Sequence, residues 1–455
     1  MIKFAKLSTI LLIAAVAHAE DSGIQAQTCD PHKADNICMT SPFDVCDEVL
    51  KVCVHKGIFP VEPSEIAGLI LLPILLAIAT VGGVGGGTIM VPVLIGMFGF
   101  TTKDAIPISS AIVFWSALLR FVLISAYAPH PLRENATQVD YNVVKCIFPV
   151  YLVGSYFGVI LSVSLGELIL VILMMLVLFT LSVQVLLKAI SLFRKETIEL
   201  KKAEGDFVAA EGGLATKDEV EKKSDAVNQS TSSVNTDALD GVTASLLGGD
   251  NASESDKKNL EVLLDRESST CKNWRSVVYT AFLMGLCIAV NLTRGTPQFD
   301  SAFGLSTCEP LSWGILVIFV ATSGFMSFRS TRRVWAQQAL KEKFGKLHSS
   351  EMFLCKKNLP FMLGTGFMSG FIGQIFGLGG GFIYGPMLMS IGVNPQVSAS
   401  TCLFMVMFSN AASTFMFLLF GRLDLHYTGW IAIFTGTGVI IGLFGMKKLM
   451  AKYKR

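Results

Sequence analysis

The chain has 455 residues, of which 52% are hydrophobic and only 16% are charged, and its formal net charge is +2 at pH 7. Soluble globular proteins carry about 25% charged residues, so this composition indicates a membrane protein with several spans. A net charge near zero, together with the lack of any nucleic-acid-binding motif, argues against a polyanionic partner such as nucleic acid.

The first 19 residues predict a secretory signal peptide. Lys3 and Lys6 precede an apolar run at residues 7–16, and the sequence Ala-His-Ala at residues 17–19 resembles a cleavage site. The alternative is a short first membrane anchor, but the run is too short to span a bilayer comfortably. We therefore expect cleavage after residue 19 and exclude residues 1–19 from the fold.

Four cysteines crowd the polar segment that follows, residues 20–60. Behind a signal peptide they would lie in an oxidising compartment, where an even number of cysteines usually pairs. Three pairings are open, and zinc binding is the competing interpretation, although no C-x-x-C pair is present. We predict a small extracytoplasmic segment stapled by disulfides. The candidate cysteines are Cys29, Cys38, Cys46 and Cys53.

Apolar runs of about 20 residues predict an all-α polytopic membrane protein with two repeats. The first transmembrane repeat, residues 61–192, holds a long unit at 66–98 and spans near 105–127, 143–165 and 168–187. Two additional spans follow in residues 274–328, near 274–292 and 311–328. The second repeat, residues 359–446, holds a long unit at 361–393 and spans near 397–420 and 427–446.

Three polar segments separate or follow these spans. Residues 193–273 are rich in Glu, Lys, Ser, Asn and Gly and almost lack aromatics, which predicts a disordered loop. Residues 329–358 and the tail, residues 447–455, are basic, so the positive-inside rule assigns both to the cytoplasm. Between the two additional spans, Asn291 begins a sequon that makes it a glycosylation candidate.

A glycine-rich sequence occurs once in each repeat. Residues 81–94 (VGGVGGGTIMVPVL) and 375–388 (IFGLGGGFIYGPML) align without a gap and are identical at seven of fourteen positions. Each glycine costs roughly 1 kcal/mol in a helix interior, so we expect both units to be unwound there. A broken helix that recurs in both halves of a membrane protein is typical of a transporter's binding site.

Length and charge predict that both glycine-containing units are re-entrant. As continuous helix, residues 66–98 would extend about 50 Å, too long for one upright crossing of a core of about 30 Å and too short for two. A single crossing would also leave the basic residues after residue 187 outside. A re-entrant pair of short helices keeps every basic segment inside, places the N-terminus outside and the C-terminus in the cytoplasm, and makes the repeats inverted.

The breaks predict an anion site. New half-helices should begin at Gly87 and Gly381, and their first N–H groups can bind an anion without a charged side chain. Nearby hydroxyls and neutral amides would add donors, and Arg120 is a charged intramembrane candidate. The predicted substrate-binding residues are Gly85, Gly86, Gly87, Thr88, Ser109, Ser110, Arg120, Gln374, Gly379, Gly380, Gly381, Ser400, Thr401 and Asn410.

Each of these features has a structural alternative. Glycines often serve close helix packing, hydroxyls bond back to their own helix, amides bridge helices, and Arg120 could snorkel to the interface. A nucleotide site is disfavoured because no strand or crossover helix accompanies the glycines. None of the six histidines lies in the middle of a predicted span, so we predict neither an enzyme nor a metal or cofactor site.

At these residues the chain resembles the sulfite exporter TauE/SafE family of membrane anion permeases. The motifs are GVGGG at 83–87, followed by residues 105–110, and GLGGG at 377–381, followed by residues 397–401. The resemblance covers most of residues 60–192 and 358–447 and implies a transporter for sulfite, sulfoacetate or related organic anions. The cysteine segment, the polar loop and the two additional spans depart from the family pattern.

The sequence therefore predicts a secondary transporter, an exporter or permease, that moves a small anion such as sulfite or an organosulfonate across a plasma membrane or endomembrane by alternating access, with the coupling ion left open. One alternative is a passive anion channel, which would keep the glycine sites but have a continuous pore. The other is a receptor or scaffold that signals through the cytoplasmic loop. The expected partners are the anion and the lipid bilayer.

Overall fold

The computed structural model describes residues 43–46, 53–81, 86–131, 133, 136–183, 186, 190, 254–270, 272–294, 310–345 and 358–453. The predicted signal peptide, Cys29, Cys38 and Gly85 lie outside these residues. Described strands are β1 (Asp44–Cys46) and β2 (Cys53–His55). The helices are α2 (Pro63–Val81), α3 (Gly87–Phe98), α4 (Thr102–Arg120), the π-helical turn η3 (Phe121–Ser125), α5 (Tyr141–Ser164), α9 (Glu254–Glu267), α10 (Trp274–Arg294), α11 (Pro310–Lys343), α12 (Leu359–Ile375), α13 (Gly381–Ser390), α14 (Pro395–Leu419) and α15 (Leu425–Tyr453).

The described residues form an all-α membrane protein, as the sequence predicts. Six of their helices are long and apolar enough to cross a bilayer. These are Thr102–Ser125, Tyr141–Ser164, Trp274–Arg294, Pro310–Lys343, Pro395–Leu419 and Leu425–Gly445. Shorter apolar helices occupy Pro63–Ala79, Gly87–Phe98, Glu167–Val183 and Leu359–Ile375, and three of these four belong to the glycine-containing units.

Both glycine-containing units are broken helices. In the first, α2 ends at Val81 and α3 begins at Gly87, directly after Gly86 with a φ of 76°. In the second, α12 and α13 are separated by a turn in which Gly377 and Gly379 have φ values of 61° and 66°. Side chains rarely adopt this left-handed conformation, so glycine is needed where the backbone turns. The predicted interruption of both helices is confirmed.

Glycines outside the breaks bring α5 and α12 into backbone contact. A Cβ atom placed on Gly154 of α5 would lie 2.2 Å from the carbonyl oxygen of Phe367, and one on Gly370 of α12 would lie 2.2 Å from that of Tyr151. Gly154 and Gly158 form a G-x-x-x-G pair, the spacing at which small residues let two membrane helices approach closely. Close packing is therefore the role of these glycines.

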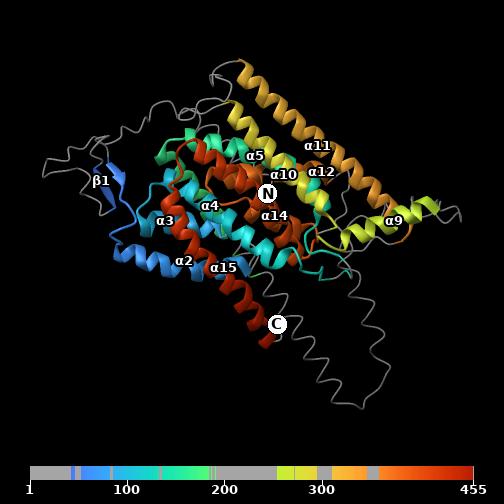
Figure 1. Ribbon diagram of the computed structural model, residues 1–455, viewed down its shortest axis with the longest axis horizontal. Coiled ribbons are helices and arrows are strands. Elements are labelled where there is room, and N and C mark those ends of the chain that lie inside the picture. The colour runs from blue at the N-terminus through green and yellow to red at the C-terminus, as the bar shows by residue number, and fades with distance from the viewer. Residues whose placement is uncertain are drawn as a thin grey trace, which may run out of the picture. The chain divides into compact units, whose positions relative to one another are not determined.

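The first broken unit packs against the last helix of the chain. In Figure 1, α15 crosses α2, and the two helices are in contact although one is near the beginning of the sequence and the other at its end. A Cβ atom placed on Gly438 of α15 would lie 2.4 Å from the carbonyl oxygen of Pro73 in α2. The second repeat thus supports the first through direct backbone contact.

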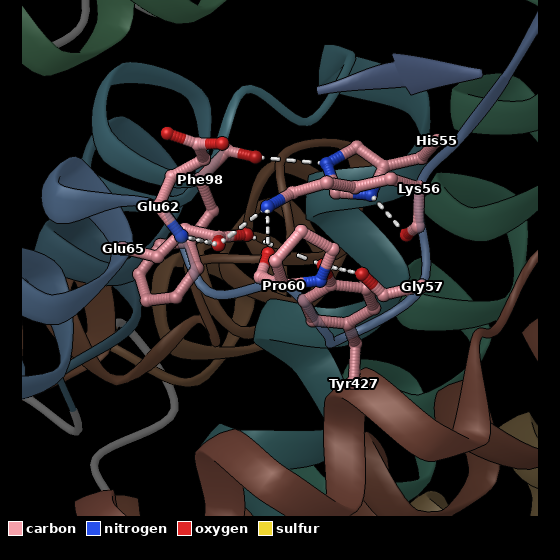
Figure 2. A network of polar contacts seen from close by, with 8 residues as sticks. All are labelled: His55, Lys56, Gly57, Pro60, Glu62, Glu65, Phe98 and Tyr427. Atoms are coloured by element: carbon pink, nitrogen blue, oxygen red, sulfur yellow. Dashed lines mark hydrogen bonds and ion pairs between the residues drawn. The ribbon is translucent and has the colours of Figure 1, made fainter. Parts of the chain in front are cut away.

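A buried polar cluster attaches the strand β2 to the starts of α2 and α15 (Figure 2). Lys56 donates from Nζ to Glu65 Oε2 at 2.8 Å, and the two side chains are only 6% and 3% exposed. The Tyr427 hydroxyl lies 3.2 Å from Glu65 Oε1 and 3.1 Å from the carbonyl oxygen of Gly57. A two-stranded hairpin is marginal by itself, so this cluster holds it against the helices.

The structure corrects two predictions about polar segments. Helix α11 continues to Lys343, so residues 329–343 are helical rather than part of a basic loop. The predicted disordered loop contains α9 at Glu254–Glu267, where Leu260 and Leu263 are buried. Composition averaged over the whole polar segment conceals this short amphipathic stretch. Residues 191–253 lie outside the described part of the chain.

Candidate functional site

The two helix breaks meet. A Cβ atom placed on Gly87, at the start of α3, would lie 2.2 Å from the carbonyl oxygen of Leu378 in the second break. Gly86 is also buried, and a Cβ atom on it would lie 2.2 Å from Leu76 Cδ2. The interrupted backbone therefore contacts protein at both breaks, as unwound backbone at membrane depth must unless it lines a cavity.

Neither helix that begins at a break has a side-chain cap. The residues that precede α3 and α13 are Gly86 and Gly380, which have no side chain to accept an N–H group, whereas Thr101, Asp140 and Asn394 cap α4, α5 and α14. Leu378, which Gly87 contacts, is three residues before the start of α13. Each helix start carries about half a positive charge, so two positive ends converge on this region. Such a region can accept an anion without any cationic side chain.

Helix α4 contributes two neighbouring serines, both fully buried. Ser109 Oγ donates to the carbonyl oxygen of Gly377 at 2.9 Å, which fixes α4 to the second break. Ser110 Oγ has no hydrogen-bond partner among the described residues. An unpaired buried hydroxyl is costly, so its donor is available to a bound anion.

The predicted amides form a pair beside the second break. Gln374 Nε2 donates to Asn410 Oδ1 at 2.8 Å, and Asn410 Nδ2 donates to the carbonyl oxygen of Val406 at 3.0 Å. A Cβ atom placed on Gly379 would lie 3.2 Å from Asn410 Nδ2. Asn410 therefore joins α12 and α14 and lies against the break, but its amide also has a structural role.

Two contacts to Gly380 were not foreseen from the sequence. The Gly380 N–H donates to the hydroxyl oxygen of Tyr151 at 3.1 Å, and Ser369 Oγ donates to the carbonyl oxygen of Gly380. A tyrosine in the middle of an apolar span needs a polar partner, which is the signal that could have identified Tyr151. Tyr384, in α13, is fully buried and its hydroxyl has no partner among the described residues.

The remaining predicted residues lie in α3, α4 and α14. Thr401 Oγ1 accepts a hydrogen bond from the Asp140 N–H at 3.0 Å, and Ser400 is buried with no partner among the described residues. Thr88 is half-buried in the first turn of α3. Arg120 ends α4, about 16 Å along the helix axis from Ser109, so it lies apart from the breaks.

Two other sequence-predicted sites are also described. Asn291 lies in α10, is 5% exposed and donates from its amide to the carbonyl oxygen of Cys287 at 2.7 Å. A glycan needs an exposed asparagine, so this burial counts against glycosylation. Cys46 and Cys53 lie directly opposite each other in the β1–β2 pair.

A comparison with known families identifies the chain. The sulfite exporter TauE/SafE family matches residues 59–215 and 272–455. The chain belongs to the sulfite exporter TauE/SafE family. It is an integral membrane protein, and both helix breaks lie within the matched ranges. Residues 216–271, which include α9, lie outside the match.

Several plant members of the TauE/SafE family are similar to the chain. Sulfite exporter TauE/SafE family protein 3 of Arabidopsis thaliana is 26% identical over 387 residues, covering 83% of this chain and 71% of the plant protein. Family protein 2 of the same plant is 23% identical over 396 residues, covering 83% and 75%. Family protein 1 is 29% identical over 193 residues, covering 40% and 41%. No solved structure matches the chain.

Proposed function

We propose that this TauE/SafE protein is a secondary transporter that carries sulfite or a related organosulfonate anion across the membrane by alternating access. The observation that carries the proposal is the contact between Gly87 and Leu378, where the two broken helices meet. Neutral donors belong to the same region: the first N–H groups of α3 and α13 lie at the breaks, and Ser110 is the neighbour of Ser109, whose hydroxyl donates to the Gly377 carbonyl oxygen.

The chemistry of the breaks suits a small oxyanion. Sulfite presents three oxygen acceptors on one sulfur atom, and it can accept several N–H and O–H donors at once. Because Gly87 and Gly381 lack side chains, such an anion could approach the backbone closely. Helix ends and hydroxyls balance the anion's charge only partly, which favours release as well as binding.

The contacts on one side of the molecule support an inverted arrangement of the repeats. His55 Nε2 lies 2.8 Å from the carbonyl oxygen of Phe98. The Thr102 N–H donates to Glu167 Oε1 at 3.3 Å, and Tyr427 contacts Gly57 as described. All of these residues belong to segments that the charge pattern assigns to the extracytoplasmic side.

A second set of contacts joins segments assigned to the cytoplasm. Asp140 contacts Thr401, and both Asn142 and Lys341 contact Glu267. If either broken unit crossed the membrane once, residues on opposite sides would have to meet. The two sets of contacts are therefore those expected if both units are re-entrant, one from each side.

The contact between the breaks corresponds to a closed conformation. With Gly87 against Leu378, an anion has no room between the two backbones, so the tips must separate to bind it. In alternating access, one glycine-containing unit would move away from the other and open the site to one side of the membrane at a time. The contact of the tips would then block a continuous pore.

Uptake of labelled sulfite by proteoliposomes tests the proposal. We expect saturable uptake that unlabelled sulfite on the opposite side accelerates, because a carrier returns faster when it is loaded. Inhibition of this uptake by sulfate and by chloride shows which classes of anion the transporter accepts. Uptake that does not saturate and is accompanied by large currents would indicate a channel, and no uptake under any ion gradient would reject anion transport.

A further inference from the structure

The carboxylate of Glu267, the last residue of α9, is contacted by three polar side chains from other segments. Lys341 Nζ donates to both carboxylate oxygens, at 2.9 and 2.8 Å. Asn142 Nδ2 donates to Oε1 at 3.2 Å, and Arg133 Nη1 lies 3.7 Å from Oε2. Two cationic side chains and one amide thus converge on a single carboxylate.

These groups are largely removed from solvent. The Lys341 side chain is 3% exposed, Glu267 is 16% exposed and Arg133 is 17% exposed. A buried ammonium group is strongly destabilised unless an anion accompanies it, so this position requires a negative charge. The nearby carboxylate of Asp140 is engaged elsewhere, since it accepts the N–H groups at the start of α5.

A cavity adjoins the Glu267 carboxylate. Its volume is about 30 Å³, and its polar lining includes Arg133, Asn142, Gln337 and Lys341. That volume holds one or two water molecules. If the carboxylate were withdrawn, the space it occupies would join the cavity, and the donors would face an enlarged polar pocket.

We propose that Arg133, Asn142 and Lys341 form a binding site for a small oxyanion, and that the Glu267 carboxylate is its built-in occupant. Sulfate, sulfite and phosphate offer paired oxygens in the same way as a carboxylate, with more charge or more acceptors for arginine and lysine donors. The three donors lie within the TauE/SafE match, whereas Glu267 lies in the unmatched residues 216–271. The unmatched segment therefore supplies an anion that competes for a site built by residues within the family match.

The site lies near one end of α14. Asp140, which lines the cavity, donates from its N–H to Thr401. Thr401 is nine residues before Asn410, about 14 Å along the helix axis from the amide beside the second break. The oxyanion site is thus separate from the breaks, and its existence does not depend on transport.

Equilibrium binding of labelled sulfate to the full-length protein in detergent tests the proposal. We expect Glu267→Ala to gain one sulfate per chain with affinity at least about tenfold above the wild type. Glu261→Ala is the matched control, because it removes the same charge from an exposed position of α9. Adding Lys341→Gln to Glu267→Ala should abolish the gained site. Equal binding by Glu267→Ala and wild type, both folded, would overturn the proposal.

Two further measurements keep the outcome clear. If Glu267→Ala unfolds, Glu267→Gln keeps the volume and removes only the negative charge. Recovery of its thermal stability by sulfate would support the site, and no recovery would make Glu267 a purely structural counter-ion. Repeating the sulfate-binding measurement in lipid nanodiscs shows whether the site binds a free oxyanion or the headgroup of a lipid. Sulfate binding that survives in both phosphatidylcholine and phosphatidylserine supports the proposal, and its loss in phosphatidylserine would overturn it.

Discussion

Gly87 and Leu378 contact each other through their backbones, at the point where the helices of both repeats are interrupted. A Cβ atom on Gly87 would lie 2.2 Å from the Leu378 carbonyl oxygen, far inside van der Waals contact. Gly380 of the second break is equally constrained, since a Cβ atom on it would lie 2.2 Å from the carbonyl oxygen of Ser369. Gly87 permits the contact between the repeats, and Gly380 permits the second break to pack against α12; larger residues would force these backbones apart.

The neighbouring serines of α4 should respond differently to substitution. Ser109→Ala removes the hydrogen bond to Gly377 and should lower the free energy of unfolding by about 1 kcal/mol. Ser110→Ala removes a hydroxyl without a partner among the described residues, so it should not destabilise the protein. It should instead raise the KM for sulfite. Thermal unfolding in detergent and uptake kinetics check both effects, and an unchanged KM in Ser110→Ala would remove this residue from the site.

The Gln374–Asn410 pair predicts a non-additive effect on stability. Asn410→Leu leaves the Gln374 amide buried without its acceptor, which should cost about 2 kcal/mol. Replacing both residues by leucine removes donor and acceptor together and should cost less than the sum of the single variants. Gln396→Leu, at an exposed position of α14, is the control. If the double variant loses as much stability as the two single variants together, the hydrogen bond contributes no specific stabilisation.

The buried Lys56–Glu65 pair should be essential for attaching the hairpin. Lys56→Met leaves the Glu65 carboxylate buried without its cation and should cost about 3 kcal/mol. The exposed pair Lys272–Asp265 provides the matched control, because Lys272→Met should cost less than about 1 kcal/mol. Hydrogen exchange of β1 and β2 should rise only in Lys56→Met. Equal exchange in both variants would contradict this role of the pair.

The strand register favours one disulfide pairing. The Lys56 N–H donates to the carbonyl oxygen of Phe43, so these two residues form a hydrogen-bonded pair. Alternation along an antiparallel ladder then makes Cys46 and Cys53 a non-hydrogen-bonded pair, the kind that brings opposite residues closest. We predict a Cys46–Cys53 disulfide, with Cys29 left to pair with Cys38. Peptide mapping without reduction would detect both bonds, and a Cys38–Cys46 peptide would contradict the prediction.

Local sequence was sufficient to locate the helix breaks. Glycine determines backbone conformation at its own position, so the starts of α3 at Gly87 and α13 at Gly381 follow from the repeated motif. The same motif and its flanks indicated the family. Hydropathy located most of the spans, because burial in a bilayer depends on the composition of a continuous run.

Contacts between distant residues could not be predicted in this way. The meeting of Gly87 with Leu378 and the hydrogen bond from Gly380 to Tyr151 depend on how the repeats pack. The sequon at Asn291 is a local tripeptide that carries no information on burial. Helix α9 was not predicted because its two buried leucines are few among many polar residues. The contacts of Glu267 could not be predicted either, because the side chains that contact it come from three separate parts of the chain.

The most direct test of the transport site compares two glycines of the same helix. Gly87→Ala places a methyl group against the Leu378 carbonyl, whereas nothing lies within 4 Å of a Cβ atom on Gly96. Overpacking of this kind costs about 1–3 kcal/mol, which a folded membrane protein can survive. In proteoliposomes we expect Gly87→Ala to lose sulfite uptake while Gly96→Ala retains it, with both proteins folded and equally incorporated. Undiminished uptake by Gly87→Ala would contradict a transport site at the meeting point of the two breaks.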